Sequence, residues 1–137
     1  MLVILDTNIF ISAFMTIGTP PDRIYQHWQT KAFTVATCSE QLEELRRVSR
    51  YNKTRARLKP HRVGTLINLL REGACFQYLT ITEEARDPHD SWLLALAETS
   101  RANFLVTGDT RAGILDRRSV AEAVVLTATD FCQRLGI

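Results

Sequence analysis

The sequence predicts an α/β protein with three layers, α/β/α, in which helices cover both faces of a five-stranded parallel sheet. Two observations support this prediction: short apolar runs alternate with amphipathic segments, and turn-forming or helix-capping residues separate them. The chain has 137 residues, of which 45% are hydrophobic and 23% charged, as expected for one globular domain spanning residues 1–137.

The predicted strands are short and mostly apolar. Residues 2–5 are interpreted as a buried strand, because four apolar side chains follow one another without polar alternation. The other strands are predicted at residues 33–36, 75–79, 104–107 and 124–126.

Helix starts are predicted from capping residues and prolines. Asn8 is the candidate cap of the first helix, and Pro21 suits the first turn of a second helix. Thr37 and Glu40 have the spacing of a capping box for a third helix. Later helices are predicted between Pro60 and Gly73, from Asp87-Pro88 through Ala97, and around Phe131 and Leu135.

Four acidic residues stand where a strand ends or on a predicted helix: Asp6, Glu44, Asp90 and Asp109. In a parallel α/β sheet, ligands gather at the carboxyl ends of the strands, so distant acids can meet there. Carboxylates that crowd together tolerate burial only with a cation between them. Oxygen ligands select hard ions, so the sequence predicts a site for Mg²⁺ or Mn²⁺.

Each acid also has an ordinary structural interpretation. Asp6 and Asp109 could simply serve as a cap and a turn residue. Asp90 begins the apolar column of its helix, but Asp87 as N-cap would equally place Asp90 in a favourable first-turn position. Spacing alone does not separate Glu44 from its neighbour Glu43.

A basic stretch follows Glu44. Residues 46–62 contain eight lysines or arginines and no acid. Arginine forks bind phosphate in a bidentate manner, so this stretch favours a nucleic-acid backbone as substrate. The substrate-binding candidates are Arg46, Arg47, Arg50 and Lys53. Tyr51 and Trp28 are candidates for stacking on unpaired bases, with packing in the core as the alternative.

Several classes of protein are disfavoured. No apolar run reaches the ~20 residues of a membrane helix. The three histidines and three cysteines show no zinc-type spacing, and no phosphate-binding glycine motif is present. The cysteines, Cys38, Cys75 and Cys132, are interpreted as buried reduced thiols of a cytoplasmic protein. The formal charge of +2 is only mildly basic.

Four segments together resemble the PIN domain family. They are LVILDTNIFISA at 2–13, SEQLEELRRV at 39–48, RDPHDSWLLALA at 86–97 and FLVTGD at 104–109. Their order and spacing are similar to those of the branch that contains VapC-like toxin components of toxin–antitoxin systems.

The resemblance implies a metal-dependent nuclease fold with the strand order 3-2-1-4-5. It matches the family's four acids to Asp6, Glu44, Asp90 and Asp109, and it implies that Asn8 and Thr107 support them. The chain departs from relatives that have more acids around the third motif, where Asp87 would have to substitute. These four acids would both catalyse and hold the metal.

The resulting hypothesis is hydrolysis of RNA phosphodiester bonds with Mg²⁺ or Mn²⁺. The branch further implies a cognate antitoxin as partner and a homodimer. No membrane association is expected, because no apolar run is long enough for a membrane helix. The alternatives are a PIN-like module that binds RNA or a partner without cutting, and an RNA-processing nuclease without an antitoxin. Phosphoaspartyl chemistry is disfavoured, because no lysine follows Lys59.

Overall fold

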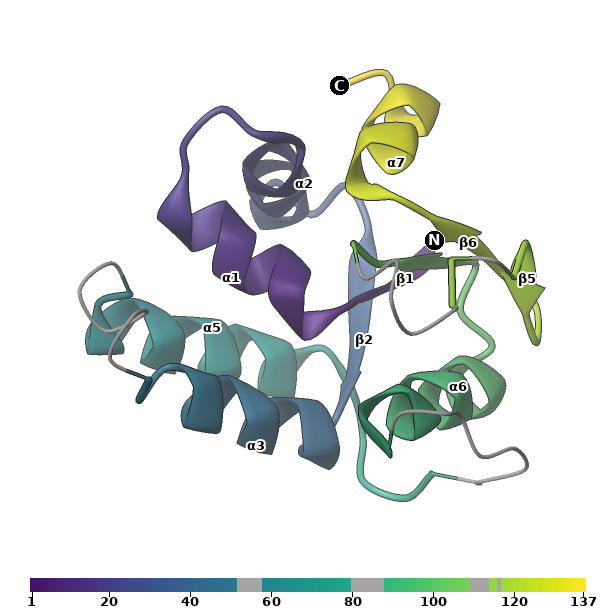
Figure 1. Cartoon of the computed structure of the whole chain (residues 1–137), viewed down its shortest axis with the longest axis horizontal. Helices are drawn as coiled ribbons and strands as arrows, with labels where there is room; N and C mark the ends of the chain where they lie inside the picture. The colour runs from purple at the N-terminus through teal and green to yellow at the C-terminus, as the bar shows by residue number, and fades with distance from the viewer. Residues whose placement is uncertain (52–57, 80–87, 109–113, 116) are drawn as a thin grey trace.

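The computed structural model describes residues 1–51, 58–79, 88–108, 114–115 and 117–137, with residues 88–90 described by their backbone alone. Helices and strands alternate along the chain, as predicted (Figure 1). In chain order the elements are β1 (Leu2–Leu5), α1 (Thr7–Met15), α2 (Pro20–Gln29), β2 (Thr34–Cys38), α3 (Ser39–Val48), α5 (Pro60–Glu72), β3 (Ala74–Phe76), α6 (Pro88–Ser100), β4 (Phe104–Val106), β5 (Ser119–Val120), β6 (Ala123–Leu126) and α7 (Ala128–Leu135).

The strands form one mixed sheet in the order β3-β2-β1-β4-β6-β5. The first five strands in this order run parallel to one another, as predicted. The predicted fifth strand, at residues 124–126, is β6, so the predicted order 3-2-1-4-5 corresponds to β3-β2-β1-β4-β6. The sixth strand, β5, pairs antiparallel with β6 and is absent from the sequence prediction. With only two residues, Ser119 and Val120, it is too short to show a period-two pattern.

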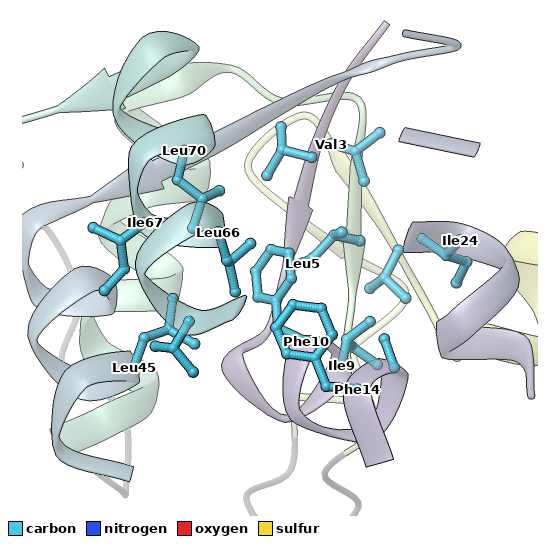
Figure 2. Close-up of a cluster of buried hydrophobic side chains, with 14 of the residues drawn as sticks. Val3, Leu5, Ile9, Phe10, Phe14, Ile24, Leu45, Leu66, Ile67 and Leu70 are labelled. Carbon is cyan, nitrogen blue, oxygen red and sulfur yellow. The ribbon is translucent and has the colours of Figure 1, made fainter. Parts of the chain in front are cut away.

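Hydrophobic side chains pack on both faces of this sheet. Along β1, Val3 and Leu5 belong to one buried cluster and Ile4 to another, as expected from the alternation of a strand. Helices α1, α2, α3, α5 and α7 pack on the first face, and Figure 2 shows part of this cluster around Leu5. Helix α6 packs on the second face, so the three-layer prediction is confirmed (Figure 1).

The start of α1 differs from the prediction. The helix begins at Thr7, so Asn8 lies inside the first turn with an exposed side chain and is not the cap. Asp6 occupies the N-cap position, with φ −58° and ψ 150°, but its side chain makes no capping hydrogen bond. The chain therefore enters the helix directly from β1, which leaves the Asp6 carboxylate for another role.

The capping box predicted for α3 is also wrong. Thr37 lies inside β2, which extends to Cys38, and α3 begins at Ser39. A residue within a strand cannot cap the following helix from two positions upstream of its first residue. Thr37 is fully buried and bonds to Gln41 instead.

Helix α6 is buried on all sides in its central part, since residues 92–97 are each at most 8% exposed. Asn103, three residues after the end of α6, is bonded to Leu2 at the start of β1. The Asn103 N–H donates to the Leu2 carbonyl at 2.8 Å, and the Asn103 Oδ1 accepts from the Leu2 N–H at 2.7 Å. The last turn of α6 thus lies at the amino edge of the sheet. Its 13 residues span about 20 Å, so its first turn lies at the carboxyl edge.

None of the described helices is both long enough and apolar enough to cross a bilayer.

Candidate active site

Asp6 is the first residue after β1, and backbone hydrogen bonds fix its position. Its N–H donates to the Val106 carbonyl at 2.9 Å, which continues the ladder between β1 and β4. Its carbonyl accepts from the N–H of Ile9 at 2.9 Å, inside the first turn of α1. The side chain is only 1% exposed.

Thr107 holds the Asp6 carboxylate from the neighbouring strand. The Thr107 hydroxyl donates to Asp6 Oδ2 at 2.8 Å, and both side chains are buried. The Thr107 N–H donates to the Leu126 carbonyl at 3.0 Å, so the backbone of Thr107 is itself fixed to β6. A hydrogen bond to a buried carboxylate is strong, and here it fixes the orientation of the carboxylate. Thr107 thus contacts the first predicted acid directly, and its supporting role in a metal site stays a prediction.

Thr7 adds an unusual oxygen atom next to Asp6. Its hydroxyl is buried and, among the described residues, is the buried side-chain polar atom without a hydrogen-bond partner. Buried hydroxyl groups normally have a partner, so an unpaired one indicates that another group is expected nearby. Asp6 and Thr7 together offer carboxylate and hydroxyl oxygen atoms, the donors that hard divalent cations prefer. Their chemistry therefore fits Mg²⁺ or Mn²⁺.

Gln41 connects three elements at this edge. Its Nε2 donates to the Leu5 carbonyl at 2.6 Å, and its Oε1 accepts from the Thr37 hydroxyl at 2.6 Å. Both polar side chains are 0% exposed. Leu5 immediately precedes Asp6, so Gln41 fixes the start of α3 to the end of β1 and to β2. Sequence reasoning missed this network, because it assigned Thr37 to a helix cap.

The position of Glu44 differs from that of Glu43. On α3, Gln41 and Leu45 form the buried face, and Glu44 is half-buried at one border of it. Glu43 is exposed and lines a groove together with Arg46, on the border that faces β3. Gln41, three residues before Glu44 and therefore on nearly the same side of α3, bonds to Leu5 of β1, so Glu44 lies on the border toward β1. Geometry thus separates two residues that the sequence could not.

The remaining predicted acids fall wholly or partly outside the described residues. Asp90 lies in the first turn of α6, at the carboxyl edge of the sheet, and its side chain is not described. The apolar face of α6 that starts at Asp90 is buried at Leu93 and Ala97. Asp87 and Asp109 lie outside the described residues. Within the described side chains, no group of three possible metal ligands occurs.

The basic candidates lie on different borders of α3. Arg46 and Arg50 line grooves on the β3 and α5 side, away from the Glu44 border. Arg47 is exposed and follows Glu44 by about one helical turn, so it lies on the same side of α3 as Glu44. Lys53 lies outside the described residues.

The two aromatic candidates for base stacking, Trp28 and Tyr51, lie in different environments. Trp28 packs against Phe10 and Tyr25, with ring centroids 5.9 and 5.8 Å apart, so its role is in the core. Tyr51 is 46% exposed just after α3.

The structure is that of an α/β protein with a buried acid, Asp6, at the carboxyl end of the central strand β1. A family model for the PIN domain matches residues 2–111, a range that contains all four predicted acids. The chain belongs to the PIN domain family. PIN domains are typically nucleases that depend on divalent metal ions, so the family supports a hydrolase that acts on nucleic acids. No curated protein and no solved structure matches the chain.

Proposed function

We propose that this protein is an endoribonuclease that hydrolyses RNA phosphodiester bonds with Mg²⁺ or Mn²⁺. The observation that most strongly supports this is the buried Asp6 carboxylate, oriented by Thr107 at the carboxyl edge of a PIN fold. A buried acid at that place has no capping role in α1, and a divalent cation would compensate its charge.

Asp6, Asp90 and Asp109 are proposed to hold the metal, and Glu44 to ligate it or to orient the attacking water. The bound metal supplies an activated water and neutralises charge on the phosphate. Thr107 orients the Asp6 carboxylate, and Gln41 holds α3 so that Glu44 stays on the β1 side. Asp87 is a candidate for an additional metal-binding carboxylate near α6. Asn8 is exposed in the first turn of α1 and is a candidate for contacting substrate at the same edge of the sheet.

The biological role proposed is that of the toxin in a toxin–antitoxin module of the cytoplasm. This follows from the resemblance of the four segments to the VapC-like branch, which also implies a cognate antitoxin and a homodimer. Ile17, 93% exposed in the turn between α1 and α2, is an apolar group available to a second copy. Co-purification with the product of an adjacent reading frame, and its inhibition of RNA cleavage, would test this role.

The nuclease proposal is tested by replacing acids without changing their size. Asp6→Asn and Glu44→Gln are each expected to lower the rate of Mn²⁺-dependent RNA cleavage by at least about 100-fold. Replacing even a residue that only hydrogen-bonds to a metal ligand typically lowers activity about 10–100-fold. Glu43→Gln makes the same chemical change one residue earlier, on the other border of α3, and is expected to keep the turnover rate.

Circular dichroism and thermal unfolding show whether each variant remains folded. Products with a 5′-phosphate end are expected from attack by water, whereas 2′,3′-cyclic phosphate ends would contradict the proposed chemistry. Full activity of folded Asp6→Asn would reject the assignment of the site.

A further inference from the structure

A groove at the edge of the sheet contains two arginines that come from different helices. It has a volume of about 520 Å³ and lies between α3, the end of α5 and β3. Arg46 comes from α3 and Arg71 from the last turn of α5. Ser39, at the start of α3, and Gln77, just after β3, add polar groups to the same lining. Sequence reasoning missed Arg71, because it lies outside the basic stretch of residues 46–62.

The two guanidinium groups are available to a ligand. Within the described part of the chain, neither Arg46 nor Arg71 forms an ion pair. Glu43 is the acid of this groove, so the lining has one negative and two positive side chains. Guanidinium forks match the geometry of phosphate oxygens, and a partly enclosed pair binds phosphate better than isolated surface charges.

An exposed aromatic residue stands beside the groove. Tyr78 follows the lining residue Gln77 and is 88% exposed, the most exposed tyrosine among the described residues. It lies just past the carboxyl end of β3, at the same edge of the sheet as Asp6. An aromatic ring next to basic side chains is the combination that binds single-stranded nucleic acid, because bases stack on the ring while arginines bind the backbone.

The groove is close to the candidate active site. In the sheet order, β2 alone lies between β3 and β1, so the ends of these two strands are about 10 Å apart. The first turn of α3 starts at the end of β2, between Asp6 and the groove. One short strand of RNA can therefore reach both places.

We propose that this groove is a binding subsite for single-stranded RNA beside the cleavage site. Arg46 and Arg71 bind backbone phosphates, and Tyr78 stacks on an unpaired base. The subsite rests on the proposed function in that RNA is the substrate, and it makes the enzyme prefer RNA that is unpaired next to the cleaved bond. Glu43 opposes phosphate binding in this groove.

The first test measures binding separately from cleavage. The full chain is titrated against a fluorescent single-stranded RNA and against a duplex of the same sequence, in EDTA, and the Kd is read from fluorescence anisotropy. Arg71→Gln and Tyr78→Ala are each expected to raise the Kd for the single strand about tenfold, and Tyr78→Phe to leave it nearly unchanged. Glu43→Gln is expected to lower the Kd. Arg71→Gln should also reduce the salt slope by about 0.7, the value for one phosphate contact on a single strand.

Arg101→Gln is the matched control for Arg71→Gln. Arg101 is exposed just after α6, at the amino edge of the sheet, so the same loss of charge there should change the Kd less than twofold. Equal effects of Arg71→Gln and Arg101→Gln would overturn the subsite, because they would indicate a general charge effect. If Tyr78→Ala raised the Kd for the duplex as much as the Kd for the single strand, the stacking role of Tyr78 would be overturned.

Cys75 provides a second, independent test, because it lines the groove and is only half-buried. Cys38 and Cys132 are buried, and burial raises the pKa of both thiols, that of Cys38 to about 12. A thiol reagent at pH 8 should therefore label Cys75 first. Bound single-stranded RNA should slow this labelling at least threefold, and an unchanged rate at saturating RNA would contradict the subsite.

These tests separate the subsite from the nuclease proposal. RNA binding that depends on Arg71 and Tyr78, in a protein that never cleaves RNA, would refute the nuclease and leave the groove assigned to RNA. Metal-dependent cleavage whose KM for single-stranded RNA is unchanged in both variants would refute the subsite alone.

Discussion

The Asp6–Thr107 pair shows how a single hydrogen bond fixes the orientation of a buried carboxylate. The carboxylate is 1% exposed, so it is already removed from bulk water. Thr107 fixes one of its oxygen atoms, Oδ2, at 2.8 Å. A carboxylate with a fixed orientation presents its remaining lone pairs in a defined direction, which lowers the cost of binding a cation.

Thr107→Val replaces the hydroxyl by a methyl group of similar size. We expect it to lower the free energy of unfolding by about 1–3 kcal/mol, because a buried acceptor loses its donor, and to lower the cleavage rate about 10–100-fold. Thr107→Ser should restore most of both properties. Urea denaturation and single-turnover cleavage measure the two effects. Thr65→Val, the same change on the exposed side of α5, should alter neither.

At the scale of elements, α3 is attached to the sheet by a polar network as well as by apolar packing. Gln41 reaches across to Leu5 and accepts from Thr37, so the helix cannot rotate without breaking two buried hydrogen bonds. Rotation of α3 would move Glu44 away from the β1 side. The network therefore contributes specificity of helix placement in addition to stability.

Gln41→Leu removes this network while keeping a side chain of similar volume. We expect the free energy of unfolding to fall by about 1–3 kcal/mol, since the Thr37 hydroxyl and the Leu5 carbonyl lose a buried partner. Urea denaturation measures the change. Gln133→Leu makes the same substitution on the exposed side of α7 and should stay within about 0.5 kcal/mol of the wild type. Equal stability of the two variants would contradict a stabilising role for the network.

The element types were predictable from sequence, and their ends were less so. The parallel strands and the main helices follow from apolar periodicity, which depends on the burial of whole faces. The caps at Asn8 and Thr37 were predicted wrongly, because capping depends on where the backbone turns, and a strand can continue up to the helix. The two-residue strand β5 has no pattern of its own, since its pairing with β6 is decided by tertiary structure.

At the scale of the whole molecule, the sheet is stabilised by apolar clusters on both faces, and the candidate site lies at its carboxyl edge. Ile24, in α2, is fully buried in the larger cluster and belongs to none of the candidate sites (Figure 2). Stability and catalysis should therefore be separable by mutation.

Ile24→Ala should lower the free energy of unfolding by about 2–5 kcal/mol, through lost burial and a residual cavity. Ile17→Ala makes the same chemical change at a side chain that is 93% exposed, and should remain within about 0.5 kcal/mol of the wild type. Thermal or urea unfolding measures both. At a temperature where Ile24→Ala is folded, its cleavage rate should match that of the wild type, and a large loss would contradict the separation of core and site.

The convergence of the four acids at one edge stays a prediction, because Asp109 and the side chain of Asp90 lie outside the described part of the chain. The structure places Asp6 buried at the carboxyl end of β1 and Glu44 half-buried on α3. The groove lined by Arg46 and Arg71 was not predictable, because its residues come from α3, α5 and β3, whose relative position depends on packing. The basic stretch in the sequence identified Arg46 and missed Arg71.

The hydrogen bond between Thr107 and Asp6 joins residues 101 positions apart, and β1 lies between β2 and β4. While a ribosome is still making the chain, β1 is present long before the residue that orients its acid. At about 5–20 residues per second, this delay is roughly 5–20 seconds. The Asp6 carboxylate therefore receives its orienting hydrogen bond only when most of the chain has been made, and the proposed nuclease would acquire its activity late in synthesis.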